Sequence, residues 1–501
     1  GIAFLILFIA GINFTNLTTS LIPLRLKTIN THRVLGCSIY KLRAISLIES
    51  IVICLISYIL ALFIVNDLSY TPIANWVDAD IRLSQYKALI LLTALIAILT
   101  GCLAGLYPAI RSTSYAPALV LKGSFGLSPK GKKVRVALIG FQYTVSIALI
   151  IVTLFMGLQN HFMTSSEQLG FNKDQVAIVN LTPEIYAKHK PQYIQKLKDY
   201  PGIEDVAFSV YELSKEDDMI DLEYARHEDK DVFFKVFYAS ENFLSVMDIQ
   251  VEEGRDFTRE DLNKAQSDYI INPAAERDFH LHPGDRFNDR TVLGVSKDFR
   301  FNSCRIASSP FVFALNNDIP NPKLVSYIRF NSKTNLQEAV AHVRETLKEI
   351  DPTFPFEISF YNTILNNLYQ KEQTLGKLIS LFGIMAILIS IVGVFGLVLF
   401  ETQYRRKEIG IRKINGATTG QILLMFNKTY IRIVSVCFII SIPIAWMGTQ
   451  QWLENFAYKT PLHLWVFIVA FLIILSVTIG TVTFRTWQAA NENPVNSVKS
   501  E

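Results

Sequence analysis

One short basic segment combines charged and apolar residues at a spacing that suits protein docking. Residues 407–418 read KEIGIRKINGAT. The apolar anchors are Ile409, Ile411 and Ile414, and the charged rim is Glu408, Arg412 and Lys413. A helix with apolar anchors and a charged rim is typical of a segment that docks into a groove of a partner protein. The alternative is a basic helix that anionic lipids hold at the membrane surface.

The same pattern occurs a second time, near the start of the chain. Residues 25–38 read RLKTINTHRVLGCS, and one constant offset aligns them with residues 405–418. The aligned pairs are Arg25 with Arg405, Lys27 with Lys407, Ile29 with Ile409, Arg33 with Lys413 and Gly36 with Gly416. Each block follows one apolar run and precedes two more, and each set ends in a tail with Lys five residues after Pro. Internal repeats are common in transporters, and the duplication favours docking over lipid binding.

The candidate contact residues therefore form two sets. They are Lys407, Glu408, Ile409, Gly410, Ile411, Arg412, Lys413, Gly416 and Ala417 in the second block, and Arg25, Lys27, Ile29, Arg33 and Gly36 in the first. Four positions of the first block depart from the second: Thr28 for Glu408, Asn30 for Gly410, Thr31 for Ile411 and His32 for Arg412. Because Thr buries less apolar area than Ile, and His is mostly neutral at pH 7, we expect the second block to grip the partner more strongly.

Other motifs with a possible chemical meaning are incomplete. Residues 126–132 read GLSPKGK, which has phosphate-loop spacing, but Lys133 follows instead of Ser or Thr and no predicted strand precedes it. His280, His282 and Asp278 are close in sequence, but no Cys or further His lies near them, so we expect plain surface residues. No catalytic constellation is recognisable. The sequence predicts no enzyme activity, no catalytic residue, no cofactor and no metal ion, and the net charge of +4 predicts no nucleic-acid partner.

The segments that position the two blocks are predicted to cross a lipid bilayer. Half of the 501 residues are apolar, which is rare in soluble domains. A spanning helix takes about 20 residues. Seven apolar runs qualify, and the chain opens inside the first, which we interpret as an N-terminal truncation. The runs are residues 1–18, 45–65, 87–110, 137–158, 375–400, 428–448 and 463–484.

Lys and Arg in the short loops predict the orientation of these spans. The loop after the first run and the loops at 111–136 and 401–427 are basic, whereas the loops at 66–86 and 449–462 are poor in Lys and Arg. Because basic loops face the cytoplasm, we expect a multi-pass protein of the inner (plasma) membrane with a cytoplasmic C-terminus. The same reasoning places residues 159–374 in the periplasm.

Residues 159–374 are expected to form a mixed α/β domain. β-branched and aromatic residues predict strands at 176–180, 206–210, 232–238 and 324–330, and apolar spacing predicts helices at 191–199 and 336–350. A run without Pro from about residue 362 to 401 predicts one helix that continues into the membrane. The alternative is a membrane helix with a separate connecting helix, and Gly376 is the expected point of a break.

The chain resembles the MacB/FtsX-type ABC transporter permeases, in particular those whose ATPase is a separate chain. KEIGIRKINGAT resembles the cytoplasmic coupling segment of that family, and LYPAIRSTSYAPALVLKGS (106–124) its end-of-repeat segment. FQYTVSIALIIVTL (141–154) resembles the helix that opens a second repeat. EEGRDF (252–257), IINPAAERDF (270–279) and VLGVSKDFRFNS (292–303) resemble its periplasmic core domain. The resemblance implies that in full-length relatives the first repeat begins with a further helix and periplasmic domain, and we expect this chain to be truncated before both.

The resemblance implies a division of the chain into five parts. They are a first FtsX-like repeat (1–122), a basic cytoplasmic connector (123–136), a spanning helix (137–158), a MacB-like core domain (159–374) and a second FtsX-like repeat (375–501). It implies a permease that couples ATP hydrolysis by a separate ATPase to periplasmic movement and export. The alternative is an FtsX-like transmitter that activates a cell-wall hydrolase. Implied partners are the ATPase, a second permease copy or a related permease, a periplasmic adaptor, an outer-membrane channel and the lipid bilayer.

Overall fold

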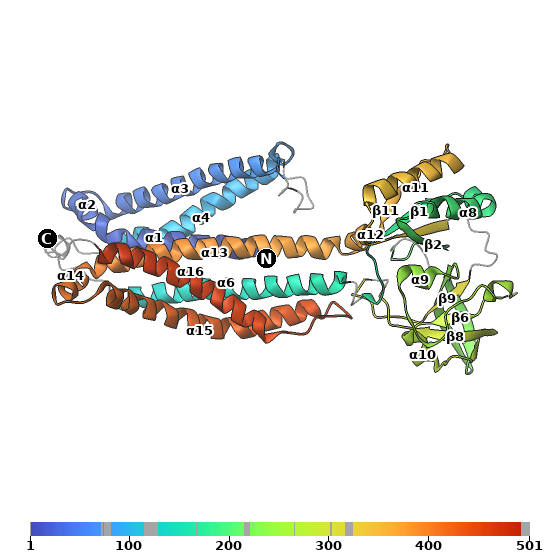
Figure 1. The fold of residues 1–501 in the computed structure, drawn as a ribbon. Coiled ribbons are helices and arrows are strands. Elements are labelled where there is room, and N and C mark those ends of the chain that lie inside the picture. Colours follow the sequence, from blue (N-terminus) through green and yellow to red (C-terminus); the bar gives the residue numbers. More distant parts are fainter. Residues whose placement is uncertain are drawn as a thin grey trace. The chain divides into compact units, whose positions relative to one another are not determined.

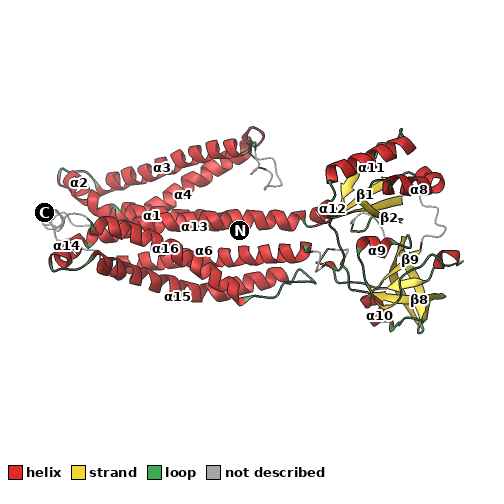
Figure 2. Cartoon of the chain, viewed as in Figure 1, coloured by secondary structure: helices red, strands yellow, loops and turns green. Residues whose placement is uncertain are grey.

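The computed structural model describes residues 2–71, 74, 82–114, 129–165, 169–214, 221–264, 266–300, 303–315 and 324–491. The chain divides into two compact units (Figures 1 and 2). A helical unit comprises Gly1–Gly157, Thr374–Trp452 and Pro461–Glu501. An α/β unit comprises Leu158–Gln373 and, from much later in the chain, Leu453–Thr460.

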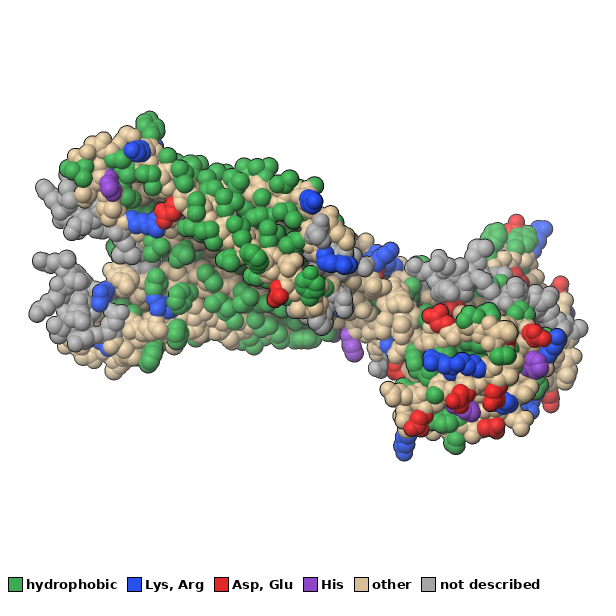
Figure 3. Space-filling model, turned by 90° about the horizontal axis from the view of Figure 1, so that it is seen from above, with side chains coloured by type: hydrophobic (Ala, Val, Ile, Leu, Met, Phe, Trp, Pro, Cys, Tyr) green, Lys and Arg blue, Asp and Glu red, His purple; other side chains and the backbone are tan. Residues whose placement is uncertain are grey.

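The helical unit contains every apolar run that the sequence singles out. Its helices are α1 (Ile2–Ser20), α2 (Ile22–Val34), α3 (Ile39–Leu68), α4 (Lys87–Thr113), α6 (Pro129–Thr164), α13 (Gln370–Tyr404), α14 (Arg406–Ile414), α15 (Thr419–Leu453) and α16 (Leu464–Ala490), with the short 3-10 helix η2 (Leu83–Gln85) before α4. Six of the described helices are long and apolar enough to cross a membrane, and the apolar helix at 3–19 is shorter. Figure 3 shows apolar side chains covering the visible face of this unit, as expected of a surface in contact with lipid.

The internal repeat of the sequence is also a repeat of helices. α1, α2, α3 and α4 occur in the same order as α13, α14, α15 and α16. α1 and α13 run in the same direction, because Asn13 of α1 donates to the carbonyl of Ile389 at 2.6 Å and Leu17, one turn further along α1, lies beside Gly396. Since α2 follows α1 and α14 follows α13, both short helices lie at the same end of the unit (Figure 1).

Small residues allow α3 and α4 to approach each other closely. A Cβ atom at Gly105 would lie 2.5 Å from the side chain of Ser50, and one at Gly101 would lie 3.0 Å from the Cα of Ile51. Both distances are shorter than ordinary van der Waals contact, so a side chain at Gly105 would displace Ser50 and one at Gly101 would be tightly packed against α3. The GxxxG spacing of Gly101 and Gly105 thus acts as a helix-packing motif.

α6 packs against the second repeat through hydroxyl pairs in an apolar setting. Tyr143 shares a hydrogen bond of 3.0 Å with Thr478 of α16, and Ser146 shares one of 2.9 Å with Ser390 of α13. Such pairs satisfy polar groups that would otherwise be unpaired within a membrane. The helix begins at Pro129, so part of the expected connector at 123–136 is helical, while residues 123–128 lie outside the described part of the chain.

The α/β unit is built on one mixed sheet. The strands are β1 (Val176–Leu181), β2 (Ile203–Ser209), β3 (Asp221–His227), β4 (Lys230–Ala239), β5 (Val251–Gly254), β6 (Tyr269–Ile271), β7 (Arg286–Phe287), β8 (Arg290–Ser296), β9 (Phe311–Leu315), β10 (Leu324–Phe330) and β11 (Ile358–Phe360). Their order is β11-β1-β10-β2-β4-β9-β6-β8-β5, with β3 paired to β4 and β7 to β8. The described pairings are antiparallel except β4 with β9 and β6 with β8.

Helices cover the sheet and complete its cores. They are α8 (Pro183–Lys198), α9 (Phe243–Met247), α10 (Pro273–Phe279), α11 (Leu336–Ile350) and α12 (Tyr361–Leu368), with the 3-10 helix η3 (Asp261–Asn263). α8 and α11 bury Tyr193, Val343 and Leu347 against β1, β2 and β10. All four predicted strands and both predicted helices are present. α8, however, begins at Pro183, because Thr182 caps it by accepting from the amide of Ile185, and the expected first residue Pro191 lies inside the helix. The predicted fold class, a polytopic helical membrane protein with a mixed α/β domain, is confirmed.

The predicted continuous helix from 362 to 401 is wrong in one respect. α12 ends at Leu368 and α13 begins at Gln370, so the break falls at Tyr369 and not at Gly376, which lies inside α13. Tyr369 is fully buried, and its hydroxyl accepts from the amide of Cys304 at 3.1 Å and donates to the Cys304 sulfur at 3.3 Å. This contact with a distant loop accompanies the break, which corresponds to the alternative of a separate connecting helix.

Candidate functional site

The two blocks form the same three-part segment in both repeats. Each consists of a short helix, a tight turn with a glycine in the left-handed region, and the capped start of a long helix. Gly36 has φ of 92° and Gly416 has φ of 88°, values that favour glycine over any residue with a side chain. Both glycines were candidate residues, and the turn gives a conformational reason for their presence.

The turns are alike at the level of individual hydrogen bonds. The amide of Gly36 donates to the carbonyl of Arg33 and that of Cys37 to His32; at the corresponding positions Gly416 donates to Lys413 and Ala417 to Arg412. This is the Schellman pattern of a helix C-terminus. The next helix is capped in both cases, because Ser38 accepts from the amide of Lys41 and Thr418 accepts from that of Gln421.

Exposure of the two segments follows one pattern. Residues 31–40 and 411–420 have the same sequence of buried, half-buried and exposed positions. The second segment exposes Ile411 (54% of its surface) and Ile414 (66%). The first exposes Val34 (63%) and Leu35 (78%), together with Tyr40. Large apolar side chains left this exposed beside charged residues are typical of contact surfaces.

Two candidate residues of the second block lie inside the chain. Ile409 is buried and lines a recess with Thr402 and Arg485, and Gly410 is buried as well. At the corresponding positions Ile29 is half-buried, and Asn30 is fully buried and donates to the carbonyl of Leu26 at 2.9 Å. Of the three expected apolar anchors, Ile411 and Ile414 are therefore available to a partner, and Ile409 holds α14 in place.

The charged candidates are used differently in the two segments. Arg412 pairs with Glu408 one turn earlier at 2.9 Å, and both remain exposed enough to meet a partner. In the first segment Arg33 donates to the carbonyl of Thr113 at 3.3 Å and Arg25 pairs with Glu49 of α3 at 2.8 Å, so these cations tie α2 to its neighbours. The backbones of Lys27 and Lys407 are helical, and their side chains are outside the description.

Sequence reasoning missed the exposed apolar residues of the first segment. Leu35 and Tyr40 correspond to Asn415 and Gly420, which are not apolar anchors, so comparison with the second block gave no reason to select them. The loss of an anchor at Thr31 is accompanied by these two additional exposed side chains. A signal was present, because two large apolar residues flank the turn glycine within a basic loop.

A second group of contacts joins the loop between α15 and α16 to the α/β unit. The amide of Tyr458 donates to the carbonyl of Cys304 at 3.1 Å, and its hydroxyl accepts from the amide of Ser308 at 3.1 Å. The guanidinium of Arg300 lies 4.1 Å from the centre of the Tyr458 ring. Gln159, at the start of the same unit, donates to the carbonyl of Tyr458 and accepts from the amide of Thr460.

An ion pair and a cation–π contact also stabilise this loop against the α/β unit. Arg305 pairs with the buried Glu372 at 2.7 Å and lies over the ring of Phe456 at 5.1 Å. Burial raises the pKa of the Cys304 thiol, so it is poorly reactive. We refer to the contacts of residues 453–460 with Gln159, Arg300 and residues 303–308 as the loop anchor. The expected outward loop at 449–462 thus contributes residues to the α/β unit.

The comparisons with known proteins concern both units. A family model described as "FtsX-like permease C-terminal" matches residues 1–117 and 380–494. The macrolide export ATP-binding/permease protein MacB of Aggregatibacter actinomycetemcomitans is 25% identical over 212 residues, which are 40% of this chain and 32% of the relative. MacB of Neisseria gonorrhoeae is 25% identical over 223 residues, 42% of this chain and 34% of the relative. The chain thus spans about a third of the length of these curated relatives.

Among solved structures, the periplasmic region of MacB from Actinobacillus actinomycetemcomitans is similar with a TM-score of 0.30 at 15% identity. The match covers 40% of this chain and 94% of that one. The family model covers the two helical repeats that carry the duplicated segments. With the MacB relatives, this match supports the similarity to permeases of the MacB/FtsX type that the sequence motifs predicted.

Proposed function

We propose that the chain is the membrane subunit of an ABC transporter and that a separate cytoplasmic ATPase docks on α2 and α14. The observation that carries this proposal is the duplicated segment: both repeats hold the same helix, Schellman turn and capped helix at one end of the unit. Each segment exposes apolar side chains next to charged ones, as helices that fit into grooves do.

The exposed fractions of the apolar side chains determine how much free energy the proposed contact can contribute. Full burial of an Ile side chain is worth about 1.5–3 kcal/mol, so covering the exposed half to two-thirds of Ile411 and Ile414 contributes about 1–2 kcal/mol each. The first segment offers Val34, Leu35 and Tyr40 over a comparable exposure. The charged rim of Arg412 and Glu408 supports the stronger grip that we expect of the second segment.

The proposal includes an export mechanism that passes movement to the α/β unit. The basic loops support a cytoplasmic position for α2, α14 and the C-terminus and a periplasmic position for residues 159–374. α6 and α13 connect the helical unit to the α/β unit covalently, and the loop anchor adds a third connection through α15 and α16. Movement that an ATPase imposes on α14 therefore has several routes to the α/β unit.

The test is capture of the partner by the full chain. The tagged protein, purified in mild detergent from its own host, should retain an ABC ATPase. Ile411→Asp with Ile414→Asp should reduce that recovery by about 30-fold or more, since about 2–4 kcal/mol is lost. Val34→Asp with Leu35→Asp should reduce it less. Tyr70→Asp serves as a matched control, because Tyr70 is equally exposed but follows the opposite end of α3.

The same capture separates export from signalling. Recovery of a periplasmic adaptor or an outer-membrane channel supports export, whereas recovery of a cell-wall hydrolase supports the FtsX-like alternative. If both docking variants retain the ATPase as well as the Tyr70→Asp control does, the proposed docking site is refuted. Purification without any ATPase would refute the proposed function itself.

A further inference from the structure

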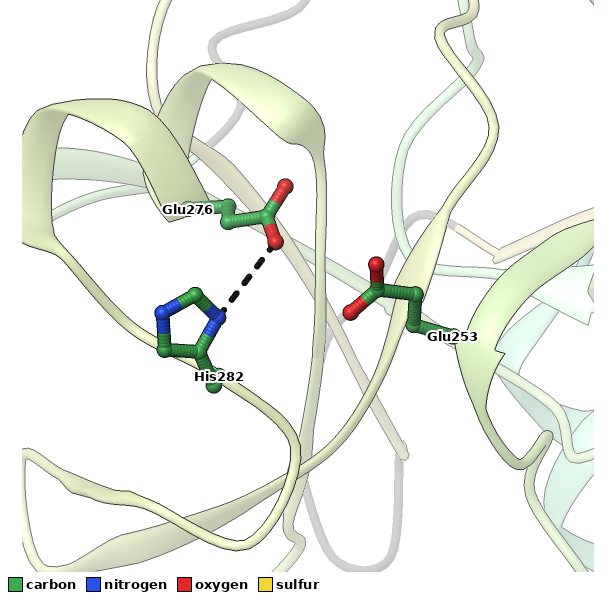
Figure 4. Close-up of side chains that lie close together, drawn as sticks. All are labelled: Glu253, Glu276 and His282. Carbon is green, nitrogen blue, oxygen red and sulfur yellow. Dashed lines mark ion pairs between the residues drawn. The ribbon is translucent and has the colours of Figure 1, made fainter.

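Three side chains from separate parts of the sequence converge on the surface of the α/β unit. They are Glu253 of β5, Glu276 of α10 and His282 of the turn after α10. One ligating atom of each lies within 4.8 Å of those of the other two, and Glu276 Oε1 is 3.6 Å from His282 Nδ1. In Figure 4 the side chains of Glu276 and His282 point toward one another, and the carboxylate of Glu253 points toward both.

The backbone holds all three positions through one strand, β8. β5 pairs with β8, where Glu253 is opposite Val295. The turn that carries His282 is bonded to the same strand, because the amide of Gly284 donates to the carbonyl of Val292 and the amide of Val292 donates to that of Asp285. The amide of Leu281 donates to the carbonyl of Glu276, which fixes the turn to α10. The group is therefore pre-positioned by main-chain hydrogen bonds and not by flexible loops.

The charge of this group is not balanced by the described cations around it. Arg255, two residues after Glu253, is engaged in two hydrogen bonds with Asp261 at 2.7 and 2.9 Å. Among the described residues, Glu253 has no ion-pair partner, and Glu276 has only the imidazole of His282. Two carboxylates this close repel each other unless a cation lies between them.

The ligand types indicate which cation fits. Calcium and magnesium prefer sites made of oxygen atoms alone, whereas an imidazole nitrogen with carboxylate oxygens suits zinc and its neighbours in the first transition row. Zinc binds His nitrogen and carboxylate oxygen at about 2.0–2.2 Å, which places neighbouring ligand atoms about 3.3 Å apart. The Glu276–His282 distance is already near that value, and rotation of the exposed Glu253 side chain can bring in the third ligand.

We propose that Glu253, Glu276 and His282 bind one divalent transition-metal ion of the zinc type on the α/β unit. Three protein ligands leave a fourth position open to water or to a ligand from a partner. This set does not include His280 and Asp278, the residues that are close together in the sequence. His280 has a left-handed backbone conformation and caps the C-terminus of α10. Glu253 enters the set only through the pairing of β5 with β8.

The experiment measures zinc binding to the full chain in detergent, purified with a tag that contains no histidine and freed of metal with a chelator. Zn²⁺ is titrated in competition with a chromophoric chelator, and Co²⁺ absorption reports nitrogen and oxygen ligation. We expect one Zn²⁺ per chain. His282→Ala, Glu276→Gln and Glu253→Gln should each weaken binding by at least about tenfold, since even changes outside the ligand set weaken metal sites by that much.

His280→Asn is the matched control, because it removes a neighbouring imidazole and Asn tolerates the left-handed conformation. It should bind Zn²⁺ as the unaltered chain does. Gel filtration checks that each variant remains folded. Absence of stoichiometric Zn²⁺ binding would overturn the proposal, as would equal losses in His280→Asn and His282→Ala. Tight Ca²⁺ binding that His282→Ala leaves unchanged would also overturn it, because it would show an oxygen-only site.

Discussion

Replacement of Tyr458 by Ala should release the loop anchor. The substitution removes the hydroxyl that accepts from the Ser308 amide, worth about 1 kcal/mol, and the ring that lies 4.1 Å from Arg300, worth about 0.5–2 kcal/mol. Loss of the ring's half-buried apolar surface adds about 1 kcal/mol. The sum is about 3 kcal/mol, which corresponds to an increase of about 100-fold in local opening.

Hydrogen exchange of the full chain in detergent measures this opening directly. The amides of Cys304, Ser308, Tyr458 and Thr460 each donate a hydrogen bond within the anchor or its immediate surroundings, so their exchange should accelerate together. Tyr458→Phe keeps the ring and should accelerate chiefly the Ser308 amide, by about fivefold. Tyr200→Ala, which removes a ring stacked on His342 elsewhere in the unit, is the matched control.

Two results would refute this reasoning. If Tyr458→Ala leaves the four amides as protected as before, the loop is held by contacts other than those of Tyr458. If Tyr458→Phe accelerates exchange as much as Tyr458→Ala, the ring and its contact with Arg300 contribute nothing.

Three further predictions concern packing, pH and orientation. Gly105→Leu should separate α3 from α4, because even a Cβ atom would lie 2.5 Å from Ser50, and the thermal unfolding temperature in detergent should therefore fall. Gly157→Leu is the control and should not lower this temperature, because no atom lies within 4 Å of a Cβ built at Gly157. Arg255, Lys264 and Thr258 hold the pKa of the Asp261 carboxyl well below its usual range, so the stability that it contributes is present above about pH 4 and is lost as the pH falls further. Asp261→Asn should accordingly lower the free energy of unfolding at pH 7 by about 2 kcal/mol, because hydrogen bonds to a charged group are lost. It should also flatten the acid dependence in a denaturant titration, and an unchanged profile would contradict this reasoning. In a chain without other cysteines, a membrane-impermeant thiol reagent added to spheroplasts should label Lys188→Cys but not Tyr40→Cys, although both positions are exposed. Cys304, restored as the single cysteine, should stay unlabelled because it is buried. Labelling of Tyr40→Cys but not Lys188→Cys would show that the orientation is the opposite one.

Features that depend on periodicity and composition could be predicted from the sequence. The apolar runs became helices because a 20-residue apolar run has few other stable forms in a membrane. The alignment of Gly36 with Gly416 could be read from the sequence, and the two glycines form turns with the same hydrogen bonds. Strands such as β10 were visible because β-branched and aromatic residues cluster there.

Features that depend on contacts between distant residues could not be predicted. The break at Tyr369 involves Cys304, which is 65 residues away in the chain. The burial of Ile409 depends on residues of α16, and its spacing resembles that of the exposed Ile411. Glu253 lies near His282 because β5 pairs with β8 in a particular register, and the spacing of nearby residues in the sequence does not predict that register. Cys304 is buried beside Tyr369, a contact between residues that are distant in the sequence.

If the proposed docking on α2 and α14 holds, the duplicated segment gives a single chain two binding sites for its partner. If two copies of the partner are joined to each other and each presents one groove, binding of the first copy raises the effective concentration of the second at the other segment to the millimolar range. The unequal side chains at Ile411 and Thr31 then make the two sites non-equivalent, so occupancy proceeds in a fixed order. Impairing the weaker segment would lower the apparent affinity by far more than its own contacts account for, because avidity is lost with it.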